Sequence, residues 1–216
     1  MKHILSDTDR TFLNRRISET EKLTGAQVVL ATVKRSDSYA EIPWIAFAFG
    51  ASVASLVTIL LDLFVLGWLT ETLILFTVAV ILITGAIFAL LTMLFTGFAR
   101  LFLSPHRKET ETMQYAESLF LSRELFSTKG RRGILLLVSQ FERQVVILPD
   151  RGVRDLLGSD VLKKVISDMT EHLRRKEPGK AMETGLEGIR AALGSPLPGS
   201  GSENELSDEI IEEEGI

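Results

Sequence analysis

Apolar residues follow two patterns along the chain, one continuous and one periodic. No charged residue occurs from 42 to 61 or from 72 to 99. A helix of about 20 apolar residues is long enough to cross the hydrocarbon of a bilayer. We therefore expect membrane-spanning helices at about 43–64 and 73–96, which together form a transmembrane helical hairpin at 42–100.

Outside this hairpin the pattern is periodic and alternates between helix and strand. Amphipathic helices are predicted where apolar residues recur every three or four positions, and strands where short β-branched runs are bounded by turn residues. The predicted helices lie at about 7–24, 110–127, 159–173 and 178–193, and the predicted strands at 26–33, 133–139 and 144–149. The side chains expected on the buried sides of the first two helices include Phe12, Leu13, Ile17, Leu23, Met113, Ala116, Leu119 and Phe120.

The soluble segments are expected to form one domain. Residues 1–41 hold one helix and one strand, which cannot bury a core alone, so they need the strands within 101–193. We expect an α/β fold, a small mixed sheet sandwiched by helices, interrupted by the hairpin. Residues 194–216 are rich in Gly, Pro and Ser and then acidic, which predicts a disordered acidic tail. Ile210 and Ile211 could form a docking motif there, although a solubilising tail is the favoured interpretation.

The distribution of basic residues predicts the orientation of the hairpin. The connection at 62–72 contains no Lys or Arg, whereas basic residues flank both spans. The positive-inside rule then places both domain halves in the cytoplasm and the short turn 67–72 outside. The first nine residues are polar and do not resemble a signal peptide. We expect a two-pass integral protein of the cell inner membrane.

Composition narrows the chemistry further. The chain has no cysteine, which excludes disulfides, iron–sulfur clusters and thiolate zinc sites. No basic face interleaved with aromatic residues is present, so nucleic acid is not an expected partner. The expected partners are the lipid bilayer and another membrane protein, and no oligomeric state is predicted.

Three stretches together resemble the TPM-domain family, named after a thylakoid-lumen protein, a photosystem II-associated protein and a receptor modulator. They are LSDTDRTFLNRRISETEKLTGAQVVLATV at 5–33, YAESLF at 115–120 and RRGILLLVSQFERQVVILPDRGV at 131–153. Their order is similar to that of the bacterial membrane-anchored branch, in which two spans interrupt the domain. The resemblance implies a compact α/β sandwich. It also implies an activity that differs between members: acid phosphatase, calcium binding, or the assembly and regulation of membrane complexes.

The resemblance also implies an acidic residue before the central strand, commonly in Asp-Asn-Gly or Asp-Asp-Gly, that helps bind a divalent ion. This chain has Arg131-Arg132-Gly133 at that place. A guanidinium cannot ligate calcium and reverses the local charge. Calcium or another divalent cation is therefore the cofactor that the family implies and that this triplet argues against.

Other candidate residues come from position alone. Asp150 follows the third strand, where α/β sites often gather, and is a candidate catalytic or metal-binding carboxylate; the alternative is a turn formed with Gly152. Asp168 and His172 are spaced i, i+4 on one helix and could approach one metal ion, although a surface pair is favoured. No nucleophile elbow, P-loop or His-Glu-x-x-His motif occurs.

A last candidate site uses cations. Four basic residues flank the second and third strands and could bind a phosphate or a lipid headgroup, namely Lys129, Arg131, Arg132 and Arg151. A basic loop without a specific ligand is the favoured alternative.

The sequence thus favours a non-catalytic module that binds a partner in a membrane complex or in envelope maintenance. The second hypothesis is a divalent-metal-dependent phosphatase of the TPM type that hydrolyses phosphomonoesters. The third is a small transporter or channel component, which the nearly featureless spans disfavour.

Overall fold

The chain forms two compact units in the computed structural model, which describes residues 5–66, 71–194, 205–206 and 210–215. The α/β unit comprises Met1–Asp37 and His106–Ile216, and the helical unit comprises Ser38–Pro105. The first and last parts of the chain therefore build one unit, with the helical unit inserted between them. The inserted unit begins four residues before the expected position 42 and ends five residues after the expected position 100.

A four-stranded sheet lies at the centre of the α/β unit, with the strand order β3-β2-β1-β4. β2 runs parallel to β1 and antiparallel to β3, and β4 runs parallel to β1. All seven residues of β2 are buried, as expected for a central strand covered on both faces. The strand bounds are β1 Gln27–Arg35, β2 Gly133–Ser139, β3 Gln144–Pro149 and β4 Ile211–Gly215.

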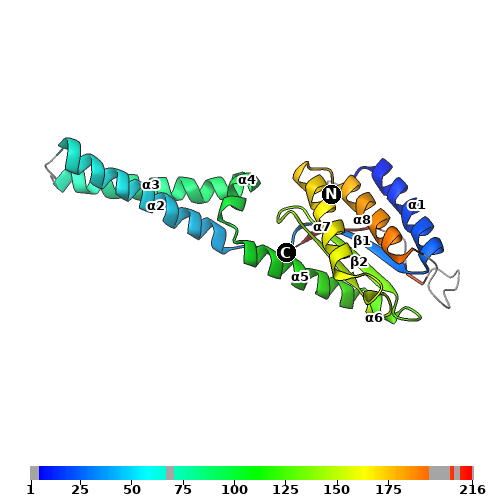
Figure 1. Ribbon diagram of the computed structural model, residues 1–216. Helices are drawn as coiled ribbons and strands as arrows, with labels where there is room; N and C mark the ends of the chain where they lie inside the picture. Colours follow the sequence, from blue (N-terminus) through cyan, green and yellow to red (C-terminus); the bar gives the residue numbers. More distant parts are fainter. Residues whose placement is uncertain (1–4, 67–70, 195–204, 207–209, 216) are drawn as a thin grey trace. The chain divides into compact units, whose positions relative to one another are not determined.

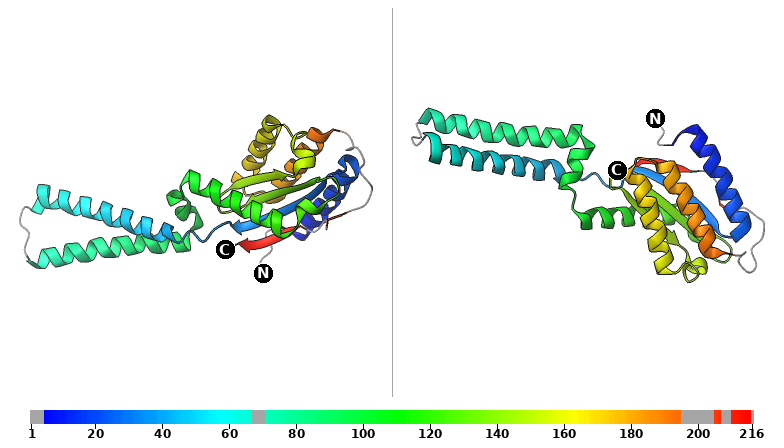
Figure 2. Two further views of the ribbon diagram at one scale, coloured as in Figure 1. Left: turned by 90° about the horizontal axis from the view of Figure 1, so that it is seen from below. Right: turned by 45° about the horizontal axis from the view of Figure 1, so that its top comes forward.

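Helices cover both faces of this sheet (Figures 1 and 2). One face packs against α1 (Asp7–Thr24), α7 (Ser159–Arg174) and α8 (Pro178–Leu193), and the other against α5 (Pro105–Ser122). Side chains of β2 alternate between the two cores, because successive residues of a strand point to opposite faces. The predicted mixed α/β fold with flanking helices is confirmed.

Some predicted core positions and boundaries differ from the structure. Phe12, Leu23 and Met113 are between 42% and 45% exposed, because each lies at the margin of its helix's apolar stripe. The helix predicted at 110–127 is α5, which begins at Pro105 because proline is well accommodated in the first turn of a helix. It is followed by Glu124 in the left-handed conformation and a 3₁₀ turn at Leu125–Ser127. The short helix α6, Arg151–Arg154, was not predicted.

The tail prediction is wrong for the residues that form β4. Ile211–Gly215 pairs with β1 instead of being disordered, and Ile210 is buried in the core beside α1. The carboxylates of β4 pair with basic side chains, so its acidic sequence is compatible with an edge strand. The remaining tail residues 195–204, 207–209 and 216 lie outside the described residues.

The helical unit is built from two long helices that pack on one another. Among the described residues, Gly50 of α2 faces Phe88 of α3, and Gly85 of α3 faces Phe47 of α2. A Cβ at either glycine would lie less than 3.0 Å from the opposing ring, so the glycines allow the helices to approach closely. The unit contains α2 Glu41–Leu61, a π-helical turn Asp62–Leu66, α3 Glu71–Leu94, α4 Thr96–Ala99 and a 3₁₀ turn Arg100–Phe102.

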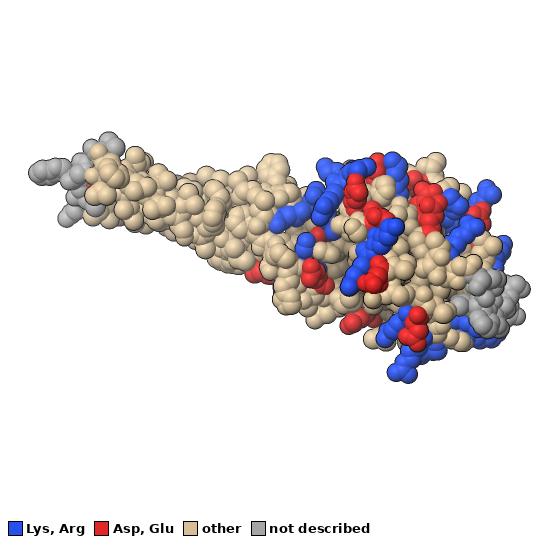
Figure 3. All heavy atoms as spheres, in the orientation of Figure 1, with Lys and Arg blue, Asp and Glu red and all other residues tan. Residues whose placement is uncertain are grey.

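Two helices of this unit, at Glu41–Phe64 and Ile74–Leu94, are long and apolar enough to cross a membrane. Most of their side chains are not buried within the protein: 17% and 6% of the most apolar windows are buried, respectively. In Figure 3 their surface is almost free of charged side chains, whereas charges are dense over the α/β unit. Of the predicted turn 67–72, residues 67–70 lie outside the described part of the chain.

Candidate functional site

The loop before β2 and the start of α6 meet at one end of the sheet, where β2 begins and β3 ends. Because β2 and β3 are antiparallel, the first residues of β2 lie beside the last residues of β3, with Ile134 opposite Pro149. The backbone continues this pairing beyond the strands. Asp150 donates its N–H to the Gly133 carbonyl at 2.8 Å, and Gly152 donates to the Arg131 carbonyl at 2.8 Å.

Gly152 makes this close approach possible. A Cβ at position 152 would lie 2.0 Å from the Gly130 carbonyl oxygen and 2.7 Å from that of Arg131. Any side chain would therefore push the two loops apart. The turn role considered for Asp150 and Gly152 thus has a steric basis in the glycine.

Asp150 is a buried carboxylate with two cationic or N–H partners. Its side chain is 5% exposed. Oδ1 accepts a hydrogen bond from the Arg151 N–H at 2.7 Å and caps α6, while Oδ2 lies 3.0 Å from Arg131 Nε in an ion pair. That ion pair lacks the alignment of a hydrogen bond, so Coulombic attraction is the main interaction at Oδ2. Both carboxylate oxygens are thus directed at groups of the protein itself.

Arg131 is held at this place by further contacts. Its backbone adopts the left-handed conformation at φ 57°, next to Gly130 at φ 77°. Its Nη1 donates to the Phe126 carbonyl at 3.1 Å, and its guanidinium lies 5.6 Å from the centre of the Phe126 ring. The guanidinium is therefore positioned by an ion pair, a hydrogen bond and an aromatic contact.

This arrangement does not fit the divalent cation that the family resemblance implies. Calcium needs several oxygen ligands in one shell. Here the carboxylate that would supply them is capped by one N–H and paired with a guanidinium. Within the described residues no group of three or more His, Cys, Asp or Glu residues could hold a metal ion.

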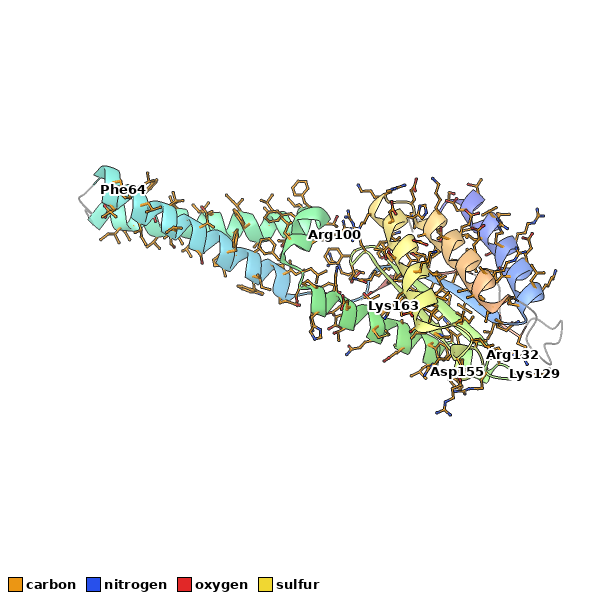
Figure 4. The ribbon with its side chains drawn as sticks, viewed as in Figure 1. Phe64, Arg100, Lys129, Arg132, Asp155 and Lys163 are labelled. Atoms are coloured by element: carbon orange, nitrogen blue, oxygen red, sulfur yellow. The ribbon has the colours of Figure 1, made fainter. Side chains whose placement is uncertain are left out.

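The basic residues predicted as an anion site lie around the same loop, but they do not form an open cluster. Figure 4 places the labelled Lys129 and Arg132 in the loop before β2. The backbone N–H of Lys129 donates to the Glu205 carboxylate at 2.6 Å, so an acidic group lies among the basic ones. The Arg131 charge is engaged by Asp150, and Arg151 is exposed on α6. The Arg132 N–H donates to Thr128 Oγ1 at 2.9 Å, which fixes the loop.

Asp168 and His172 lie on α7, away from the Asp150 loop in sequence and fold. Asp168 is exposed, and His172 Nδ1 lies 3.2 Å from Glu177 Oε2 beyond the end of the helix. The pKa of Glu177 is lowered, first by the hydrogen bond from Lys180 and then by that from His172. The structure thus pairs His172 with Glu177, a residue the sequence analysis did not consider.

A second polar group, which the sequence analysis missed, lies at the carboxyl ends of β1 and β2. Glu142 is 3% exposed and accepts the Ser36 N–H at 2.8 Å and the Ser139 hydroxyl. Ser36 Oγ donates to Ser139 Oγ at 3.1 Å and lies 3.5 Å from Thr112 Oγ1. The sequence signal for this group was the spacing Ser-x-x-Glu at 139–142, which lets a hydroxyl and a carboxylate meet across the short connection between β2 and β3.

The Glu142 group is closed to substrates. Ser36, Thr112, Ser139 and Glu142 are each between 0% and 3% exposed, so a carboxylate-activated hydroxyl there cannot meet a solute. The carboxyl ends of parallel strands are where α/β proteins often bind ligands. In this protein that end is filled by hydrogen bonds that join β1, the β2–β3 turn and α5, which is a structural role.

The third feature that the sequence analysis missed is the set of carboxylates on β4. Glu212 Oε1 accepts from Arg10 Nε of α1 at 2.7 Å. Glu213 accepts from the Tyr115 hydroxyl and pairs with Arg123 at 3.3 Å. Burial, followed by the hydrogen bond to Glu213, raises the pKa of Tyr115. Each acidic residue of the strand thus meets a donor from a different element.

Comparison with known proteins gives one domain match and a similar fold. Residues 100–192 match the TPM domain family. The NMR structure of the BA42 protein from the psychrophilic bacterium Bizionia argentinensis is similar, with a TM-score of 0.58 over 98% of this chain and 97% of that chain. The sequence identity is 13%, so this likeness shows the fold alone. No curated protein sequence matches the chain.

The family match covers α5, β2, β3 and the helices that follow. It includes the Arg131–Asp150 pair and, of the Glu142 group, Thr112, Ser139 and Glu142 but not Ser36. It leaves α1 and β1 outside the matched residues, although both belong to the same unit. The chain therefore contains a TPM domain at residues 100–192, within an α/β fold whose sheet is completed by β1 and β4.

Proposed function

We propose that this protein is a membrane-anchored TPM-domain protein whose α/β unit is a non-catalytic module that binds another membrane protein. The observation that carries the proposal is the ion pair between Arg131 and the buried Asp150. It places a protein cation on the carboxylate that is best situated for metal chemistry. A module whose own arginine neutralises that carboxylate is better suited to binding than to hydrolysis.

Membrane anchoring is supported by what the two long helices expose. Trp44, Phe64 and Leu75 are each at least 74% exposed, and an apolar surface of this kind is stable in lipid rather than in water. Four hydroxyls on these helices donate to carbonyls of their own helix, namely Ser52, Ser55, Thr58 and Thr92. These four hydroxyls therefore need no water.

The proposed placement is the cell inner membrane, with both parts of the α/β unit in the cytoplasm. Lys34, Arg35, Arg107 and Lys108 flank the helical unit on the side of the α/β unit, and 62–72 carries no basic residue. This asymmetry follows the positive-inside rule. The single α/β unit built from both flanks supports the same arrangement, because its two halves must share one compartment.

A direct test measures activity and ion binding on the full chain in lipid nanodiscs. We expect hydrolysis of p-nitrophenyl phosphate, with calcium, magnesium or manganese present, to equal that of a buffer blank. We also expect calorimetric titration of calcium and manganese to give no saturable heat. Turnover above the blank that Asp150→Asn abolishes and Asp160→Asn leaves intact would establish the phosphatase alternative and overturn the non-catalytic assignment.

A further inference from the structure

The outer edge of β1 is covered by a strand of unusual origin. β4 is separated from the end of α8 by residues 194–210, and it adds to β1 in parallel with Ala31 opposite Ile211 and Val33 opposite Glu213. An edge strand exposes unpaired N–H and C=O groups that can template pairing with another extended segment. The edge of β1 is therefore a site that accepts an added strand, and β4 shows which sequence it accepts.

The side chains of β4 define two kinds of recognition. Ile210 is 6% exposed in the core beside α1, and Ile211 packs against the core beneath α5. The alternation of a strand sends these two isoleucines to opposite faces of the sheet. The site therefore buries one isoleucine on each face of the sheet.

The acidic residues that follow are each met by a donor of opposite or neutral charge. Arg10 binds Glu212, Arg123 and Tyr115 bind Glu213, and Lys34 binds Glu214. Arg10 lies on α1, Tyr115 on α5, Arg123 directly after α5 and Lys34 on β1, so donors surround the edge on both sides of the sheet. An extended segment with two aliphatic residues followed by three carboxylates is complementary to it.

β4 is also held in a way that permits exchange. The strand is five residues long, and two of its three ion pairs are open to solvent, with Arg123 52% and Glu214 61% exposed, whereas Glu212 is 8% exposed in its pair with Arg10. Exposed ion pairs contribute little and are screened by salt.

We propose that the edge of β1 is a strand-addition docking site for an extended acidic segment of a partner protein, and that β4 occupies it as a tethered competitor. This inference rests on the proposed binding function and assigns it a surface. Strand addition to a sheet edge supplies affinity through main-chain hydrogen bonds and specificity through alternate side chains. The tether gives β4 an effective concentration of about a millimolar, so a partner binds only when its segment competes successfully.

The test uses a dye-labelled peptide that copies residues 204–216 and full chains in nanodiscs. One chain is intact and the other ends at residue 203, with its folding checked by thermal unfolding. We expect saturable binding to the shortened chain, at least 10-fold weaker binding to the intact chain, and at least a 10-fold loss when Glu212, Glu213 and Glu214 of the peptide are replaced by lysine. Equal binding to both chains, or none to a folded shortened chain, would overturn the proposal.

Two further measurements separate the alternatives. Because the chain has no cysteine, Ala31→Cys can be combined with a cysteine at the position of Ile211 in the peptide, and we expect a disulfide there but not with Val29→Cys on the same strand. If the shortened chain fails to fold, the intact chain with Glu212→Lys, Glu213→Lys and Glu214→Lys replaces it. Its β4 no longer matches Arg10, Arg123 and Lys34, whereas these residues stay available to the peptide, so we expect it to bind the peptide more tightly than the unaltered chain does. A dimer of the intact chain that shortening dissociates would assign the edge to a second copy instead. Absence of peptide binding alongside absence of phosphatase activity would reject this surface while leaving the proposed function standing.

Discussion

Arg131 and Asp150 together determine the chemistry that the loop before β2 can support. The cap of α6 and the backbone pairing around Gly133 fix the position of the buried Asp150. A metal would need further oxygen ligands, whereas a guanidinium needs one carboxylate and brings its own charge. The Arg131 guanidinium thus satisfies a buried carboxylate that has no further oxygen ligands beside it to complete a metal shell among the described residues.

Replacing Arg131 with alanine is expected to destabilise the α/β unit by about 1 kcal/mol, because the buried Asp150 loses its counter-charge. The value is small since the arginine side chain is 48% exposed and the pair is screened by solvent. Thermal unfolding followed by circular dichroism in detergent measures it. Arg132→Ala, in the same loop, is the matched control and should have a smaller effect; the reverse ranking would contradict the assigned pair.

Gly152 offers a sharper residue-scale test. Alanine at 152 would place its Cβ 2.0 Å from a backbone oxygen that cannot rotate away, so we expect a loss of about 1–3 kcal/mol. Alanine at Gly158 meets nothing within 4 Å and should be nearly neutral. Urea unfolding midpoints of the two variants compare them directly, and similar midpoints would show that the loops do not approach as described.

Among the helices and strands, those with a local hydrophobic pattern were predicted from the sequence, whereas β4 and the Glu142 group, which depend on contacts between distant residues, were not. The central strands and the apolar helices follow from local pattern, as in β2, whose buried run is unbroken. β4 could not be predicted from local pattern, because three consecutive glutamates are typical of a solvent-exposed segment. Only the folded chain brings a basic partner to each of them, namely Arg10 to Glu212, Arg123 to Glu213 and Lys34 to Glu214. The Glu142 group was missed for the same reason, since Ser36 lies 106 positions from its partner.

The docking of β4 is expected to depend on pH at both extremes. The hydrogen bond from Lys34 lowers the pKa of Glu214 from 4.5, so its contribution is present above pH 4.5 and is lost as the pH falls through the lowered value. The pKa of Tyr115 is raised from 10.0, so its contribution is present below pH 10 and declines as the pH rises further. β4 should be most firmly docked between these limits.

The anisotropy of a dye on Ile216→Cys measures this dependence, since a docked tail tumbles slowly. We expect high anisotropy at pH 7 and a fall below pH 4.5. Lys34→Met should move the acid transition up toward pH 4.5, whereas Lys22→Met on the exposed side of α1 should not. A transition unaffected by Lys34→Met would contradict the role of that ion pair.

Packing of the helical unit gives a second prediction at this scale. A Cβ at position 85 would lie 2.9 Å from the Phe47 ring, and valine adds two methyl groups to it. Gly85→Val should therefore push α2 and α3 apart. Valine at Gly97, which has nothing within 4 Å, is the control. Disulfide trapping between cysteines placed at Gly50 and Phe88 reports the separation: it should decrease with Gly85→Val and persist with Gly97→Val. Equal trapping in both backgrounds would refute close packing at Gly85.

At the scale of the whole molecule, the order of segments carries the main functional consequence. The first strand and the rest of the sheet are separated in sequence by the helical unit, yet β1 and β2 are neighbours with Gln27 opposite Gly133. This is possible in a membrane only if the inserted unit returns the chain to the side it left. The family resemblance and the hydropathy pattern predicted this arrangement together, whereas the partner-binding edge depends on contacts between segments that only the folded molecule brings together.

The most direct test of this account is the sidedness of two single cysteines in intact cells. Thr70→Cys lies in the connection between the spans, and Asp160→Cys replaces a side chain that is 97% exposed in the α/β unit. With an impermeant maleimide, the account predicts labelling of Thr70→Cys before lysis and of Asp160→Cys only after it. Labelling of Asp160→Cys in intact cells, or of Thr70→Cys only after lysis, would contradict the proposed anchoring of a cytoplasmic TPM-domain module by a two-helix hairpin.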